Sequence, residues 1–125
     1  MRIYFSQESD PMIYGSITEL SDTFLRLNDF LSSNQSELLV LCNCSVSPDP
    51  YEKCLPYIKF VKSNLDSVLV YMDSNFGLVV EGSTELLYIY IEAFKFTSGD
   101  VGQHHHSDRS IGGKNNIWPF VESSD

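Results

Sequence analysis

Three consecutive histidines are the side chains of this sequence most suited to chemistry, in the run Gln103-His-His-His-Ser-Asp108. Alternate residues of a strand point to the same side, so an extended run places His104 and His106 on one face. Two imidazoles and the carboxylate of Asp108 are ligands that Zn²⁺ accepts. One possible function is therefore a metal-binding protein or a metal-dependent hydrolase centred on His104, His106 and Asp108.

The remainder of the sequence does not complete such a site. No histidine precedes His104, and the chain has no G-x-S-x-G elbow, no Walker loop and no G-x-G-x-x-G run. These are the short motifs that mark common hydrolases and nucleotide-binding enzymes. The stronger prediction is a protein that is not an enzyme and has no cofactor and no metal.

The three cysteines indicate a reducing environment. An odd number of cysteines cannot close a complete set of disulfides, and Cys42, Cys44 and Cys54 are the only ones. Cys42 and Cys44 belong to an apolar run that predicts a buried strand with both thiols on one face. We expect all three to be structural thiols.

Acidic residues outnumber basic ones by seventeen to eight, which gives a formal net charge of −9. Residues 63–94 contain five carboxylates and neither lysine nor arginine. The five are Asp66, Asp73, Glu81, Glu85 and Glu92. Such a surface repels nucleic-acid phosphates and anionic lipid, and it attracts a basic protein. The alternative is that the charge serves solubility alone.

The length of 125 residues fits one domain, 1–125, with residues 109–125 as a loosely packed tail pinned by Trp118 and Phe120. The longest apolar runs are far shorter than the roughly 20 residues that a membrane-spanning helix needs. The first residues lack the apolar stretch of a signal peptide. We therefore expect a cytoplasmic protein that does not bind membranes.

The clearest predicted element is a helix that begins after Ser16. Ser16 and Glu19 have the spacing of a capping box, and apolar residues then recur every three or four positions up to Leu31. Strands at 2–5 and 12–14, joined by a turn at 9–11, precede this helix. The predicted core joins helix residues to strand residues. It comprises Leu20, Phe24, Leu27, Leu39, Leu41, Leu69 and Val79.

Strands are predicted next, at 37–45, 57–62, 67–72 and 77–81, the first central in the sheet and the last three forming a meander. Residues 51–63 are ambiguous between helix and strand. A helix beginning at Asp49-Pro50 would contain Pro56, at a cost of about 3 kcal/mol, so a strand is favoured.

A second helix is predicted within residues 82–96, after a Gly-Ser pair like the one before the first helix. It is apolar on two faces, which is more than one sheet contact covers. Leu87, Ile91 and Phe94 are therefore predicted to contact a partner. The acidic residues of this predicted surface are Glu81, Glu85 and Glu92, and its neighbours on the following strand are His104 and His106. The fold class is α+β, a mainly antiparallel sheet of about six or seven strands with two helices on one face.

The segment 77–87 is a strand that passes through Gly82-Ser83 into an apolar helix, and the strand-like His104-x-His106 follows it. This arrangement resembles small immunity proteins of bacterial polymorphic toxin systems, over about residues 50–108. The resemblance implies a non-enzymatic cytoplasmic protein that binds a toxin domain and blocks its active site. Many such toxins are basic, which agrees with the acidic composition. A domain that homodimerises through the second helix is a further alternative.

Overall fold

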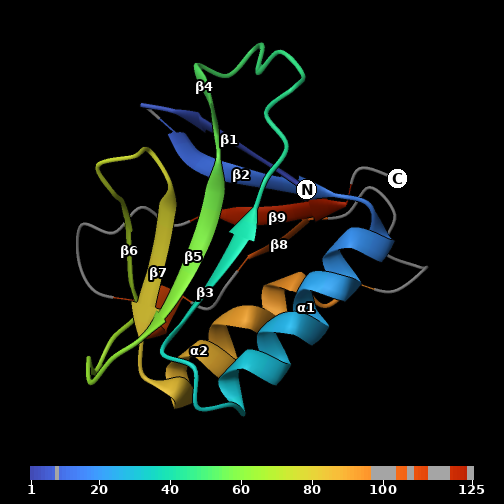
Figure 1. Cartoon of the computed structure of the whole chain (residues 1–125). Coiled ribbons are helices and arrows are strands. Elements are labelled where there is room, and N and C mark those ends of the chain that lie inside the picture. The colour runs from blue at the N-terminus through green and yellow to red at the C-terminus, as the bar shows by residue number, and fades with distance from the viewer. Residues whose placement is uncertain (8, 97–103, 107–108, 113–118, 124–125) are drawn as a thin grey trace.

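The computed structural model describes residues 1–7, 9–96, 104–106, 109–112 and 119–123 (Figure 1). This part of the chain contains two α-helices, one five-stranded sheet and one four-stranded sheet. The helices are α1 (Ile17–Leu31) and α2 (Thr84–Tyr90), and the 3-10 helices are η1 (Ile91–Phe94) and η3 (Arg109–Ile111). The strands are β1 (Arg2–Ser6), β2 (Ser9–Gly15), β3 (Glu37–Leu41), β4 (Lys53–Leu55), β5 (Tyr57–Lys62), β6 (Leu69–Met72), β7 (Leu78–Gly82), β8 (His104–His106) and β9 (Phe120–Ser123).

The larger sheet, sheet A, has the strand order β4-β1-β2-β9-β8, and the smaller, sheet B, has the order β3-β5-β7-β6. Only the pairs β2/β9 and β5/β7 are parallel among the described strands. The predicted α+β class, with mainly antiparallel pairing and two helices, is confirmed, but the strands form two sheets and not the single sheet of six or seven strands that was expected. The predicted meander is wrong, because β7 inserts between β5 and β6 and runs parallel to β5.

Helix α1 begins as predicted. The hydroxyl of Ser16 accepts from the backbone amide of Glu19 at 3.1 Å, and the Glu19 carboxylate accepts from the backbone amide of Ser16 at 2.9 Å. This reciprocal capping satisfies two amides that the first turn leaves free. Leu20 and Leu27 are fully buried, whereas Phe24 is only half-buried, with the ammonium of Lys95 5.8 Å from its ring centre.

The second helix is also confirmed, as α2 followed by η1. Ser83 caps it, and its hydroxyl accepts from the backbone amide of Leu86 at 3.3 Å. The helix lies beside α1 (Figure 1), so it has neighbours on two sides.

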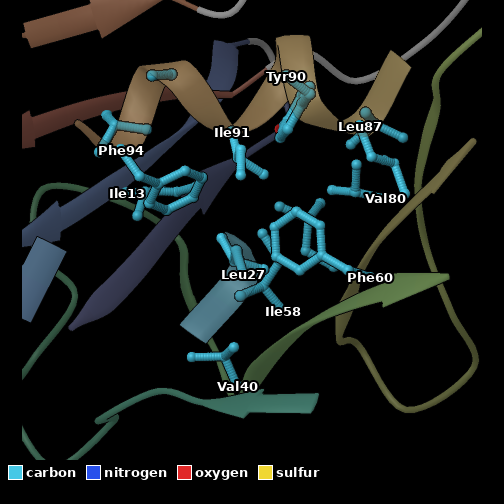
Figure 2. Close-up of a cluster of buried hydrophobic side chains, with 14 of the residues drawn as sticks. Ile13, Leu27, Val40, Ile58, Phe60, Val80, Leu87, Tyr90, Ile91 and Phe94 are labelled. Carbon is cyan, nitrogen blue, oxygen red and sulfur yellow. The ribbon is translucent and has the colours of Figure 1, made fainter. Parts of the chain in front are cut away.

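One core lies among the two sheets and the helices (Figure 2). Sheet B supplies residues such as Val40, Ile58, Phe60 and Val80, and sheet A supplies Ile13. The ring of Phe60 meets the rings of Tyr90 and Phe94 edge-on, with centroids 6.2 and 6.3 Å apart. The helices thus pack against sheet B through aromatic contacts.

Strand β3 differs from its prediction in length and in position. It ends at Leu41 and lies at the edge of sheet B, not at the centre. The predicted core residues Leu39, Leu41 and Leu69 are 47%, 75% and 38% exposed, while Val40 and Val70, one position away, are buried. Because side chains alternate along a strand, the prediction placed β3 and β6 with the wrong face inward. Val79 is buried, as expected.

The C-terminal segment contributes to sheet A. β9 lies between β2 and β8, and Val121 joins the core. The expected loose tail therefore contains an interior strand, while Trp118 lies outside the described residues.

Candidate partner-binding surface

The three apolar residues predicted to meet a partner lie in the core instead. Leu87, Ile91 and Phe94 are 0%, 1% and 0% exposed, and Figure 2 shows all three pointing into the cluster of buried side chains. The prediction that they present apolar surface was wrong. The helix is apolar on two faces because α1 lies on one side of it and the sheets lie on the other.

The acidic residues of the predicted surface do not gather at one place. Glu85 and Glu92 are exposed on the outer side of α2 and η1, near the exposed Tyr88 and Ile89. Glu81 alternates with the inward-facing Val80, so it lies on the opposite side of sheet B. There its carboxylate accepts a hydrogen bond from the hydroxyl of Tyr71 at 3.2 Å.

The histidine run forms β8, as its spacing predicted. The middle residue, His105, stacks on the ring of Phe96 with centroids 3.9 Å apart, and its Nδ1 lies 3.3 Å from the carbonyl of Ala93. β8 is thus a neighbour of η1. Asp108 lies outside the described residues, and among those described no three His, Cys, Asp or Glu side chains form a metal-binding group. A metal site at His104 and His106 stays a prediction.

The side of sheet B that faces away from the core is exposed along its edge strands, although Val79 at its centre is buried, and we call this side the open sheet face. It consists of the outward side chains of β3, β5, β7 and β6. One cross-strand row runs from Leu39 through Lys59 and Val79 to Tyr71, and the next from Glu37 through Val61 and Glu81 to Leu69. Leu41 and Tyr57 extend the face at one end. The three leucines lie on the edge strands β3 and β6 and are exposed, so both edges of this face are in contact with solvent.

A tight turn at one end of the open sheet face displays an aromatic ring. Phe76 is 54% exposed and has a φ of 62°, a left-handed conformation that is unfavourable for a bulky residue. Asp73 holds the turn, because its Oδ1 accepts from the backbone amides of Asn75 and Gly77 at 2.9 and 3.0 Å. Such strained positions persist only where surrounding contacts fix them.

Tyr57 connects this turn to the sheet. Its hydroxyl donates to Oδ2 of Asp73, and this bond is the main reason that the pKa of Asp73 is lowered. The same bond raises the pKa of Tyr57. The ring of Tyr57 crosses directly over Gly77, where an added Cβ would lie 1.9 Å from Cε1 of the ring. Only glycine therefore permits this contact at position 77.

A groove of about 570 Å³ adjoins Phe76. Its lining includes Cys44, Cys54, Lys53 and Asn75. The ammonium of Lys53 lies 4.2 Å from the centre of the Phe76 ring, which is a cation–π contact. The groove and the open sheet face thus share Phe76 at their border.

A second hollow, of about 390 Å³, lies on sheet A and is lined by tyrosines. Tyr4 stacks on Tyr51 with centroids 5.1 Å apart and meets Tyr14 edge-on. Burial, and then a hydrogen bond to Glu122, raise the pKa of Tyr14. This hollow is separate from the open sheet face.

Several basic side chains lie over aromatic rings. Lys62 lies over Phe30, Lys53 over Phe76 and Arg2 over Tyr4. In the described part of the chain, the ion pair given by the structure joins the Met1 amino group to Glu19 at 2.5 Å. None of the ion pairs given for the described residues includes Glu37, Glu85 or Glu92.

The sequence contained one signal of the open sheet face that its interpretation missed. The run Leu38-Leu-Val-Leu41 is apolar on both faces of its strand. That pattern is typical of a central strand, but it also occurs in an edge strand whose outer face binds another protein. The sequence around Phe76 contains no comparable signal.

Comparisons with protein-family models, with curated proteins and with solved structures find no match to this chain.

Proposed function

We propose that this chain is a non-enzymatic protein-binding module of the immunity type, which binds a basic toxin domain through the open sheet face. The observation that carries the proposal is the exposure of Leu39, Leu41 and Leu69 on one side of sheet B, and of Phe76 in the turn at the end of the sheet. Leu39 and Leu41 lie two residues apart on the same side of β3, and apolar patches on a protein surface often mark interaction sites.

The apolar residues suit the centre of an interface. Binding energy concentrates in a few apolar or aromatic side chains that partner contacts exclude from water. Phe76 is held by a turn whose hydrogen bonds converge on Asp73, so its ring loses little freedom on binding. Tyr57 and Tyr71, whose hydroxyls donate to Asp73 and Glu81, are similarly fixed.

The charge favours a basic partner over an acidic or neutral one. Glu37 and Glu81 lie on the open sheet face, and the net charge of the chain is −9. Unpaired carboxylates attract a positively charged protein over distance and raise its association rate. Lys59, the basic residue within the face, is flanked by Leu39 and Val79 in its row.

No membrane contact enters the proposal. In the described residues, neither helix has the length or the unbroken apolar sequence that crossing a bilayer requires. The proposed partner is a protein, and the proposed place of action is the cytoplasm.

The test begins with the gene that precedes this one, which we expect to encode a large secreted protein with a basic C-terminal domain. That domain is expressed in bacteria with and without this chain, and growth is measured. We expect the domain to arrest growth and the chain to restore it. Arrest that persists when the folded chain is present would contradict the proposal.

A further inference from the structure

Two cysteine side chains meet where the edges of the two sheets adjoin. Cys44 lies in the segment that continues from β3, the edge strand of sheet B, and Cys54 lies in β4, the edge strand of sheet A. The backbone amide of Cys42 donates to the carbonyl of Pro56 at 2.9 Å. The segment after β3 therefore runs beside β4 in the opposite direction.

The two thiols interlock across these segments. The Sγ of Cys44 donates to the carbonyl of Leu55 at 3.3 Å, and the Sγ of Cys54 donates to the carbonyl of Asn43 at 3.3 Å. The pKa of Cys54 is raised to about 11, first by burial and second by a hydrogen bond with the Cys44 side chain. Both side chains also line the groove beside Phe76, and Cys44 is exposed to solvent.

The third cysteine stands apart from this pair. The Sγ of Cys42 donates within its own segment, to the carbonyl of Val40 at 3.7 Å. Burial raises the pKa of Cys42 to about 12. Cys42 is therefore an internal control for any reaction of the other two.

We propose that Cys44 and Cys54 form an oxidisable thiol pair, which a low-molecular-weight disulfide of the oxidised glutathione class converts to an intramolecular disulfide. The exposed Cys44 thiolate attacks one sulfur of that disulfide, whose S–S bond breaks and releases one thiolate. The Cys54 thiolate then attacks the Cys44 sulfur of the mixed disulfide, and the second thiolate leaves. Two protein thiols are oxidised, one small disulfide is reduced to two thiols, and the two protons pass to the leaving thiolates.

The cross-link would join the two sheets at their edges. It would also close the segment 45–53 into a loop, which includes Tyr51, the residue stacked on Tyr4. A short disulfide loop restricts the unfolded chain and so stabilises the folded one. This inference does not depend on the proposed function.

The experiment incubates the native protein with mixtures of oxidised and reduced glutathione, stops the reaction with acid, and maps the products by peptide mass spectrometry. We expect one intramolecular disulfide that joins Cys44 to Cys54, with Cys42 free. The variant Cys42→Ser should oxidise like the wild type, while Cys44→Ser should form no intramolecular disulfide. The oxidised protein should unfold at a higher urea concentration than the reduced protein.

Other products would overturn the inference. These are a disulfide that includes Cys42, a glutathione adduct that persists on Cys44, or the same mixture of pairings that the urea-unfolded protein gives. Circular dichroism tests whether the Cys44→Ser variant is folded, so that unfolding can be separated from a loss of oxidation. Cys54→Ser is a second variant, for which we expect the same result.

Discussion

At the scale of single residues, Phe76 combines two features that are unfavourable for an isolated protein. Its backbone has positive φ, and its ring is 54% exposed. Asparagine adopts this conformation more readily, yet the sequence has phenylalanine. A residue that costs stability and exposes apolar surface is typical of a binding site.

This contrast gives a prediction for Phe76→Asn. The free energy of unfolding should stay unchanged or rise by up to about 1 kcal/mol, because backbone strain is relieved while one exposed cation–π contact with Lys53 is lost. Partner affinity should fall. Urea unfolding and calorimetric titration measure the two quantities. A variant that is clearly less stable and binds as well as the wild type would show that Phe76 serves the fold.

The hydrogen bond from Tyr57 to Asp73 gives a prediction about pH. The pKa of Asp73 is lowered in the folded protein. The ionised carboxylate therefore contributes to stability at pH values above 3.8, the usual pKa of this group. That contribution disappears as pH falls through the lowered pKa. In Tyr57→Phe the main cause of the lowering is absent. Wild type should therefore exceed the variant in unfolding free energy at pH 6, and the excess should shrink as pH falls below about 4. A difference that does not vary with pH would exclude this linkage.

At the scale of elements, the sequence was most informative where one short pattern determines the local structure. The Ser16 capping box and the apolar spacing predicted α1, and Pro56 argued correctly for a strand at β5. The predictions were wrong where the structure depends on contacts between residues that are distant in the sequence. Which face of β3 is buried can be predicted only when its neighbouring strand and its position at the edge of the sheet are known. The insertion of β7 beside β5 likewise depends on pairing between distant segments.

The same limitation affected the candidate site. Both apolar stripes of α2 and η1 were visible, but the presence of α1 beside them was not, so Leu87, Ile91 and Phe94 were interpreted as surface. Phe76 could not be predicted, because its exposure depends on hydrogen bonds that Asp73 makes within the turn.

Helix α2 offers a matched pair that tests this correction. Leu87→Ala should lower the free energy of unfolding by about 2–5 kcal/mol, because Leu87 is fully buried in the core. Ile89→Ala, two residues away and 44% exposed, should cost no more than about 1 kcal/mol. Urea denaturation of both variants measures these two losses of unfolding free energy. Equal losses would mean that the core does not include this side of the helix.

At the scale of the whole molecule, the proposed function assigns charge and apolar surface to different steps of binding. In this proposal the carboxylates act over distance, and they extend beyond the open sheet face to Glu85 on α2 and Glu92 on η1. The apolar residues act at contact. We therefore expect rising salt to slow association with the toxin domain while it changes dissociation little. Stopped-flow mixing measures both rates, and an association rate that is independent of salt would show that the acidic surface serves solubility alone.

The most direct test of the proposed function compares two surfaces on the same folded protein. Leu39→Ser/Leu41→Ser alters the open sheet face, and Tyr88→Ser/Ile89→Ser alters the exposed side of α2. The measurement is the dissociation constant for the toxin domain, by surface plasmon resonance. We predict that the first variant weakens binding at least about tenfold, mainly through faster dissociation, and that the second changes it less than about twofold. Weakening by the α2 variant alone would contradict the assignment of the open sheet face.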